Sequence, residues 1–570
     1  MRKQTKLVAV LSTAALLALG ASMSSFAATG WQEENGTWVY YDKSGDKETE
    51  KWEKSGDNWF YLNEDGEMST DVIVEYDDNY YYVDDNGSMV TNKWVSVTNE
   101  DYDGDNADEP ANYWYYFGSN GKAYKTSATS TSATFKTING KKYIFDDEGK
   151  MLYGWINKEG ERETTEEDRW QNGDYYCGDE NDGAQSVGWV SIDIVDNDYE
   201  TSLKGGSSKN VFDDENQTRW FYFKSNGKKL SGENGKTING KKYSFDKYGR
   251  MNAEWVNWDA TPSLASQSDD NTAAAIASNS HGFRYYGSPE DGARVTKGWF
   301  QVVPDSYLND GDYDDDSTNW YYSDKDGRLT ANELKTINGK KYLFDQYGAM
   351  QDGLRAVIFE SGSTSKVADI KKSDKIDGNH FDTEDEFKAH MSDIYTDLDY
   401  RLYYFGSGDD GAMKTGKQTV SIDGTNFSFL FNKSGSTKGQ GKFGVDSDKY
   451  YLGGMLMQAD KDDKYSVVKI VKEGETFKEI KLLTTEQFLF GEDGVEATSN
   501  IPSTKADDYD EYYDLTIKAA DKTVDGVTTQ YRLVNTSGTV QKSKSKAKDG
   551  DSRCYEVGPD KTIKTVFVES

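Results

Sequence analysis

Aromatic residues recur in short alternating runs along most of the chain. From Gly30 the sequence contains "GTWVYYDKSGD", then "DNWFYLNEDGEM", then "NYYYVDDNGSM", in units of about 20 residues. Rings at alternate positions, such as Trp38 with Tyr40, fall on one face of a β-strand. The "DxxG" or "DDNG" that follows predicts a turn with glycine where a positive φ is needed, so each unit is predicted to be a β-hairpin.

A single hairpin is marginally stable in water, whereas stacked hairpins bury a continuous row of rings. The pattern therefore predicts an all-β solenoid of stacked hairpins. The stretch "KTINGKKY" begins at Lys136, Lys236 and Lys335, and other hairpin types recur at the same interval. Three hairpin types thus form a super-repeat of about 100 residues, with polar insertions between hairpins.

The first 27 residues have the features of a secretory signal peptide. "MRKQTKLVAVLSTAALLALGASMSSFA" contains basic residues, a short apolar run and then small residues, and we expect cleavage after Ala27. No second apolar stretch of membrane-spanning length follows, and no lipid or sorting motif ends the chain. The sequence therefore predicts an exported protein that does not insert in the membrane after cleavage and would remain on the cell only by binding.

The remaining chain divides into three predicted parts. Residues 28–95 form a first block of repeats, and residues 96–416 form a hairpin solenoid with the 100-residue super-repeat. Residues 417–570 contain degenerate units, such as "GTNFSFLFNKSG" and "DKYYLGGM", which predict diverged hairpins and a C-terminal cap. One short helix is predicted near residues 382–395, because Phe387, Met391 and Ile394 share a helical face.

The amino-acid composition limits the classes of ligand that we expect the protein to bind. The formal net charge is −34, which argues against nucleic acid and anionic membranes, because both require basic surface. Neutral sugars and cationic ligands remain as candidate partners. The two cysteines, Cys177 and Cys554, form no disulfide framework, and the acidic insertions 101–108 and 310–316 do not match a calcium-binding loop. We predict no cofactor and no metal.

Catalysis has little support in the sequence. His281, His380 and His390 are scattered, and neither a nucleophile elbow, a zinc-binding helix nor a phosphate-binding glycine loop is present. No stretch of about 120 residues without repeat traces remains for a catalytic domain. The sequence therefore predicts a protein that is not an enzyme.

The repeats resemble a known family. "GWQEENGTWVYYDKSG" and "KWEKSGDNWFYLNEDGEM" are similar to the choline-binding, or cell-wall-binding, repeats of Gram-positive surface proteins. "TINGKKYxFDxxGxM" followed by "GW" resembles equally the short repeats of clostridial toxin receptor-binding domains and of glucan-binding domains. The resemblance is clear over about residues 30–435 and weak beyond.

The resemblance implies aromatic pockets between hairpins. In the choline-binding branch, the tryptophan of "GW", the first ring of the next strand and a tyrosine of the following hairpin form one pocket. Carried over to this chain, the two predicted ligand-binding groups are Trp31, Trp38 and Tyr61, and Trp52, Trp59 and Tyr82. The competing interpretation of each ring is structural, since rings at a period of two are commonly core.

Three lysines depart from this pattern. In the "NGKKY" copies, the position that Trp38 occupies in "GTW" is held by Lys142, Lys242 and Lys341. An ammonium there would repel a cationic ligand but could donate hydrogen bonds to sugar hydroxyls, so these lysines are candidate sugar-binding residues. Their alternative role is a solvated strand face. We expect a choline-like cage only in the N-terminal block.

These observations favour a non-catalytic, exported repeat protein of the cell wall. It would attach non-covalently to the bacterial envelope through teichoic-acid choline or wall glycan, with weak pockets that gain avidity by repetition. An alternative is an adhesin that recognises host or dietary glycans. A further alternative is a wall-active enzyme whose site lies within the degenerate residues 417–570.

Overall fold

The computed structural model describes most of the chain after the predicted signal peptide. The described residues are 29–102, 104, 109–201, 203–259, 280–372, 387–388, 391, 400–406, 408–491, 494–495, 497–498, 515–517, 521–551 and 553–568. The predicted cleavage site after Ala27 lies outside them, as do His380, His390 and most of the helix predicted at 382–395. Of that segment, Phe387, Lys388 and Met391 are described, and they are helical.

The chain divides into two compact units. The first contains residues 1–190 and 221–229, and the second contains residues 191–220 and 230–570. The strands β13 (Gly188–Val195) and β14 (Asn216–Phe223) are each divided between the units.

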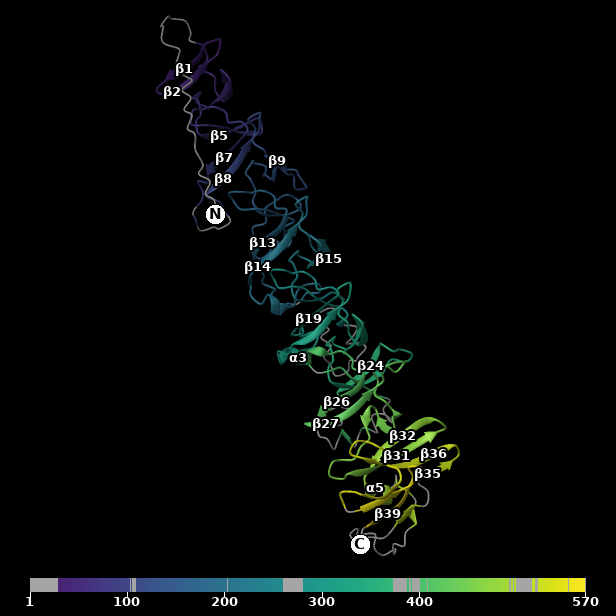
Figure 1. The fold of residues 1–570 in the computed structure, drawn as a ribbon. Coiled ribbons are helices and arrows are strands. Elements are labelled where there is room, and N and C mark those ends of the chain that lie inside the picture. The colour runs from purple at the N-terminus through teal and green to yellow at the C-terminus, as the bar shows by residue number, and fades with distance from the viewer. Residues whose placement is uncertain are drawn as a thin grey trace. The chain divides into compact units, whose positions relative to one another are not determined.

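The first unit is built from two-stranded antiparallel hairpins (Figure 1). They are β1 (Gly30–Glu34) with β2 (Thr37–Tyr41), β3 (Lys51–Ser55) with β4 (Asn58–Leu62), β5 (Val72–Tyr76) with β6 (Asn79–Val83), β7 (Lys93–Thr98) with β8 (Asn112–Phe117), β9 (Lys136–Ile138) with β10 (Lys141–Tyr143), and β11 (Gly154–Ile156) with β12 (Tyr175–Cys177). The second unit begins in the same way, with β15 (Glu233–Ile238) and β16 (Lys241–Phe245), β17 (Trp255–Asn257) and β18 (Phe283–Tyr285), β19 (Gly298–Val302) and β20 (Asn319–Ser323), and β21 (Glu333–Ile337) and β22 (Lys340–Phe344). The predicted all-β fold of stacked hairpins is confirmed.

The repeat that contains β9 and β10 has two turns with different chemistry. The turn that joins the two strands of β9 and β10 is Asn139–Gly140, with φ of 50° and 82°, and two consecutive positive φ values favour Asn-Gly. The Asp-x-x-Gly turn, which the sequence analysis assigned to the hairpin itself, follows the second strand instead. There Asp146 Oδ1 accepts the backbone N–H groups of Glu148 (3.0 Å) and Lys150 (2.7 Å). Burial raises the pKa of Asp146 to about 6.

In other repeats the glycine of the corresponding turn packs against a methionine of the preceding repeat, whereas Gly149 packs against Ala123. A methyl group built on Gly87 would lie 2.8 Å from Met68, and one on Gly121 would lie 2.4 Å from Sδ of Met89. Both glycines also have positive φ, 76° and 77°. Close packing and backbone conformation therefore both require glycine at this position.

The second unit continues with larger sheets. A three-stranded sheet has the order β24 (Val367–Lys372), β23 (Leu354–Phe359), β25 (Arg401–Tyr404). A five-stranded sheet follows, in the order β26 (Gly416–Ile422), β27 (Thr425–Phe431), β30 (Met455–Leu456), β29 (Lys449–Leu452), β28 (Gly444–Asp446). The last two sheets are β32 (Thr476–Leu483), β31 (Tyr465–Glu473), β36 (Val527–Asn535), β35 (Asp521–Val524), and β33 (Ala497–Thr498), β34 (Leu515–Ile517), β39 (Ile563–Val568), β38 (Arg553–Val557), β37 (Lys544–Lys548).

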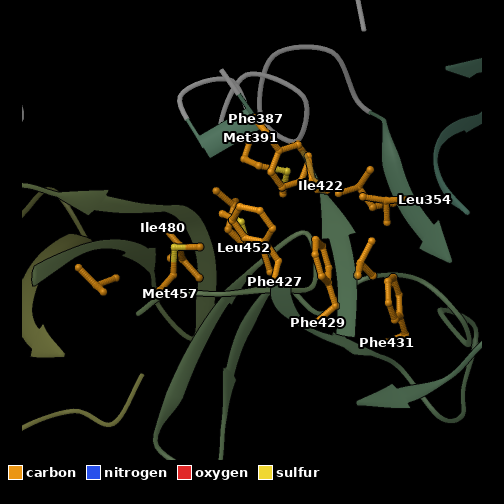
Figure 2. Close-up of a cluster of buried hydrophobic side chains, with 14 of the residues drawn as sticks. Leu354, Phe387, Met391, Ile422, Phe427, Phe429, Phe431, Leu452, Met457 and Ile480 are labelled. Atoms are coloured by element: carbon orange, nitrogen blue, oxygen red, sulfur yellow. The ribbon is translucent and has the colours of Figure 1, made fainter. Parts of the chain in front are cut away.

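The first three of these sheets share an aliphatic and aromatic core, whereas the last sheet packs in a second hydrophobic cluster with residues of β31 and β36. Figure 2 shows Phe427, Phe429 and Phe431 of β27 in this core, with Phe387 and Met391 beside them. The rings of Phe387 and Phe427 lie 5.4 Å apart. Ile470 and Val534, from paired strands far apart in sequence, belong to the same cluster.

Helices are short in the described part of the chain. Besides the helical residues Phe387, Lys388 and Met391, the described part contains α1 (Arg169–Asn172), α3 (Asp310–Asp314) and α5 (Thr485–Phe490), with 3-10 turns η1 (Lys209–Val211) and η3 (Gly408–Asp410). α3 is formed by the acidic insertion at 310–316, between β19 and β20. None of the helices that the structure describes has the length and apolar character needed to cross a membrane.

Candidate functional site: the joints between hairpins

Neighbouring hairpins are held together by a recurring backbone hydrogen bond. In each case a backbone carbonyl on the second strand of one hairpin accepts a hydrogen bond. The donor is the backbone N–H of a residue in the turn that follows the next hairpin along the chain. The bond joins Trp38 to Met68 (2.7 Å), Trp59 to Met89 (2.8 Å), and Trp114 to Met151 (2.7 Å) in the first unit, and Trp320 to Met350 (2.8 Å) in the second. Where this position is tryptophan, the donor is thus methionine.

Each of these bonds marks a group of side chains that we name a Trp–Met joint. A joint contains two tryptophans from one hairpin, and a ring and a methionine from the next. Within single units the described residues form four: joint 1 (Trp31, Trp38, Phe60, Met68), joint 2 (Trp52, Trp59, Tyr81, Met89), joint 3 (Trp94, Trp114, Tyr143, Met151) and joint 4 (Trp299, Trp320, Tyr342, Met350).

Joint 1 encloses a small pocket. Trp31, Trp38, Phe60 and Met68 line it, together with Ser55. The Trp31 ring lies 5.5 Å from the Phe60 ring at an interplanar angle of 72°. The edge of one ring therefore meets the face of the other, which is a favourable aromatic geometry. The pocket walls are mainly apolar, and their ring faces offer electron-rich surface to a ligand.

Joint 2 is exposed at its outer tryptophan. Trp52 packs against Tyr61 (5.2 Å) of its own hairpin and against Tyr81 (5.1 Å) of the next. The Trp59 side chain is 41% exposed, and Nζ of Lys54 lies 6.0 Å from its ring centroid. A cation thus already sits at the outer limit of cation–π distance from this ring.

The structure places Tyr61 and Tyr82 outside the pockets for which they were predicted. Tyr61 pairs with Trp52 and shares its face, while the neighbouring Phe60 faces the first hairpin. Likewise Tyr81 meets Trp52, whereas Tyr82 stacks on Phe117 at 6.0 Å. Burial raises the pKa of Tyr82, and its hydroxyl donates to Asp71. Because successive residues of a strand point to opposite faces, the third ring belongs one residue earlier than predicted.

Joint 3 was missed by the sequence analysis. The Trp94 ring lies 4.9 Å from that of Tyr143 and 5.2 Å from that of Tyr116. Trp114 packs in the same cluster with Met151. Tyr143 is the tyrosine of the first "KTINGKKY", so this motif supplies the third ring of the preceding joint. Burial raises the pKa of Tyr143 and of Tyr81 above the ordinary phenol value.

Joint 4 adds a carboxylate to the rings. The Trp299 ring lies 6.4 Å from that of Trp320 and 4.8 Å from that of Tyr342. Nε1 of Trp320 donates a hydrogen bond of 2.8 Å to Oδ1 of Asp409. A negative charge at the edge of an aromatic group favours a cation near it.

The three predicted lysines occupy the position that corresponds to Trp38. The carbonyl of Lys142 accepts the N–H of Gln185, that of Lys242 accepts from Arg294, and that of Lys341 accepts from Met413, each at 2.8 Å. The alignment made from the sequence is therefore correct for the backbone. Sugar binding by these lysines stays a prediction.

The adjacent lysines have a structural partner that the sequence analysis missed. Nζ of Lys141 lies 3.2 Å from Oδ1 of Asp182, and Nζ of Lys241 lies 3.0 Å from Oδ1 of Asp291. Each aspartate belongs to the turn after the next hairpin. In these two copies the first lysine of "KK" thus links two hairpins, and the second holds the tryptophan position. The pairing of "NGKK" with a later "xDGA" was a signal for this link.

The joints contain no cluster suited to metal chemistry. In the parts of the chain that the structure describes, no group of three or more His, Cys, Asp or Glu side chains could hold a metal ion. Burial raises the pKa of the Cys177 thiol to about 12, so this cysteine is a poor nucleophile. What the joints offer chemically is ring surface for stacking and for cation–π contact.

Comparison with known families agrees with this geometry. Residues 49–94 match the family model described as "Choline-binding repeat", and residues 111–123 match the one described as "Putative cell wall binding repeat". The first match spans joint 2, and the second contains Trp114 of joint 3. The chain thus carries repeats of the choline-binding type, and the predicted resemblance is confirmed.

Longer similarities are weaker. The glucosyltransferase-S of Streptococcus mutans serotype c is 25% identical over 300 residues, which is 52% of this chain and 16% of that protein. The chain is also similar to choline binding protein F of Streptococcus pneumoniae, at 18% identity over 69% of this chain and 98% of that one, with a TM-score of 0.34. The modular autolysin LytC of Streptococcus pneumoniae is 20% identical over 58% of this chain and 55% of that one, with a TM-score of 0.29.

Proposed function

We propose that this chain, as a carrier of choline-binding repeats, is a non-catalytic protein of the bacterial cell surface that holds a wall polymer in its Trp–Met joints. The ligand would be the choline of teichoic acid or a sugar of the wall glycan. The observation that carries the proposal is the repeated grouping of two tryptophans, a third ring and a methionine. Together with the family matches over residues 49–94 and 111–123, it supports a binding role.

A quaternary ammonium fits the chemistry of the joints best. It has no hydrogen-bonding group, so it requires no polar partner in an apolar pocket, and ring faces attract its charge. In joint 4, Asp409 adds a carboxylate beside Trp320. The net charge of −34 further favours a cationic ligand over a phosphate group.

Attachment would depend on several weak contacts at once. A single shallow cage binds a small headgroup weakly, whereas joints that engage one polymer chain together add avidity. Export through residues 1–27 and retention at the cell surface belong to the same proposal.

The test is co-sedimentation of the protein with purified walls that contain or lack choline. We expect sedimentation with the choline-containing walls and release by free choline. A variant with Trp38→Ala, Trp59→Ala, Trp114→Ala and Trp320→Ala should remain in the supernatant. Tyr102→Ala is the matched control, because Tyr102 is 45% exposed and belongs to none of the four joints. Equal sedimentation of the quadruple variant and the control would overturn the proposal.

Glycan binding is the second candidate, and the lysine positions favour it. At Lys142 and Lys242 the ring is replaced by a hydrogen-bond donor, which suits a sugar hydroxyl better than a cation. Such a protein would be an adhesin for host or dietary glycans. A glycan array separates the two: binding to oligosaccharides that Lys142→Ala and Lys242→Ala abolish, without wall binding, would favour the adhesin.

An enzymatic role has its own test. We expect no soluble products after prolonged incubation of the protein with wall polymer or glucan. Release of reducing sugar by the full chain would show a catalytic site and would contradict the proposed binding role.

A further inference from the structure

The acidic insertion of α3 forms one wall of a large polar cavity in the second unit. The cavity has a volume of about 520 Å³, within the range of small-molecule sites. Its lining comes from α3, from the start of β20, from the turn after β22, and from β23 and β24. None of the four Trp–Met joints supplies this lining except through Met350.

Asp312 is the residue of α3 that lines the cavity. Nδ2 of Asn309 and Nδ2 of Asn319 donate to the same carboxylate oxygen, Oδ2, at 2.6 and 2.8 Å. Among the described residues, the side-chain hydrogen bonds of Asp312 end on Oδ2. Two amides therefore fix the carboxylate, and Oδ1 keeps its capacity to accept from a ligand.

The lining also contains Asp345 and Arg355. Oδ1 of Asp345 accepts the backbone N–H groups of Tyr347 and Ala349, both at 2.9 Å. Burial raises the pKa of Asp345 to about 7, and the charge of Asp312 contributes in the same direction.

Arg355 is held by its neighbours. Its Nε donates a hydrogen bond of 2.9 Å to Oε1 of Gln351, and its Nη2 donates one of 3.0 Å to Oδ1 of Asp352. The lining contains four carboxylates, those of Asp312, Asp345, Asp352 and Asp369, and the single guanidinium of Arg355.

We infer that this cavity binds an amino sugar, that is, a sugar ring with a protonated amine. Carboxylates accept hydrogen bonds and do not donate them when ionised, so the lining calls for a ligand rich in donors. Sugar hydroxyls supply such donors, and the amides of the wall can accept or donate to complete them. An ammonium on the ring would compensate the excess negative charge through a charge-assisted bond to Oδ1 of Asp312. This inference does not depend on choline binding by the joints.

Titration of the full chain at pH 6.5 with glucosamine, glucose and N-acetylglucosamine tests it. We expect glucosamine to bind at least about tenfold more tightly than the two neutral sugars, the effect of one charge-assisted hydrogen bond. The Asp312→Asn substitution should lower the affinity for glucosamine by a similar factor. Asp314→Asn is the matched control, because Asp314 lies on the same helix and is exposed.

Two further measurements distinguish binding in this cavity from binding in joint 4. Trp320→Ala should leave glucosamine affinity unchanged, and choline should not compete with glucosamine. Unchanged thermal unfolding of Asp312→Asn would show that the variant folds. Equal affinity for glucose and glucosamine, equal affinity of Asp312→Asn and the parent protein, or no binding of glucosamine at millimolar concentration would each overturn the inference.

Discussion

Joint 3, which follows β8, and the corresponding position after β10 share the same backbone hydrogen bond between hairpins but differ in their side chains. In the first, the carbonyl of Trp114 accepts from Met151 at 2.7 Å, and in the second, that of Lys142 accepts from Gln185 at 2.8 Å. The Phe135 ring lies 5.1 Å from that of Tyr175, as Trp94 lies 4.9 Å from Tyr143. The main chain therefore keeps the hairpins together in both joints, and the side chains are free to determine what each joint can accept.

The largest expected effect is the loss of a tryptophan from joint 3. Trp94→Ala removes contacts with three rings, those of Tyr116, Tyr143 and Phe145, and we expect a loss of about 3 kcal/mol in local stability. Hydrogen exchange at the Met151 amide measures it, because that N–H forms the joint bond. Lys142→Ala is the comparison, and the Gln185 amide should keep its protection. Equal loss at both amides would contradict the division between backbone and side-chain roles.

The next effect is the conversion of one joint into the other. Lys142→Trp with Gln185→Met would place a tryptophan and a methionine in the β10 joint beside Phe135 and Tyr175. The result has the composition of a Trp–Met joint, with Phe135 in place of the first tryptophan. If the proposed function is correct, equilibrium dialysis should show about one additional choline bound per chain. Lys142→Ala with Gln185→Met is the control and should add none.

A smaller effect is expected from Gln185→Met alone. Nε2 of Gln185 is buried and has no hydrogen-bond partner among the described residues, and the side chain lies against Gly227 as Met68 lies against Gly87. Methionine would fill the same space without an unpaired donor and should stabilise the protein by about 1 kcal/mol. Urea unfolding followed by fluorescence measures the change. A destabilised variant would mean that the amide is solvated.

The smallest effect is expected from Asp182→Ala. The ion pair with Lys141 is more than half exposed on both sides, and exposed pairs contribute little to stability. The hydrogen bond from Lys141 to Asp182 raises the pKa of Lys141. We expect no resolvable change in thermal unfolding and a fall in the pKa of Lys141, measured by NMR titration. A clear loss of stability would make the link between these hairpins structural.

The sequence predicted the hairpins well because their signals are local. Alternating rings, Asn-Gly and a positive-φ glycine each act within a few residues, so stacked hairpins follow from them. The third ring of joints 1 and 2 was misplaced by one residue, although strand alternation contained the information. Phe60 lies between Trp59 and Tyr61, which share the other face, and it therefore points to the preceding hairpin.

The C-terminal sheets could not be predicted in the same way. β31 pairs with β36, so that Tyr465 lies opposite Asn535. Such a pairing depends on the shared core of Ile470 and Val534 and leaves no local periodic signal. A local signal was available for α5, where Thr484 and Gln487 form a capping box.

The close packing of each joint's methionine against a turn glycine makes the joint sensitive to oxidants. A methyl group on Gly121 would lie 2.4 Å from Sδ of Met89, so there is no room for an added atom on that side of the sulfur. A sulfoxide would place a polar oxygen in this contact and would force Met89 away from the turn. Because each hairpin contacts mainly its neighbours, the damage would stay within one joint. Reduction of the sulfoxide would restore that joint without refolding the rest of the chain.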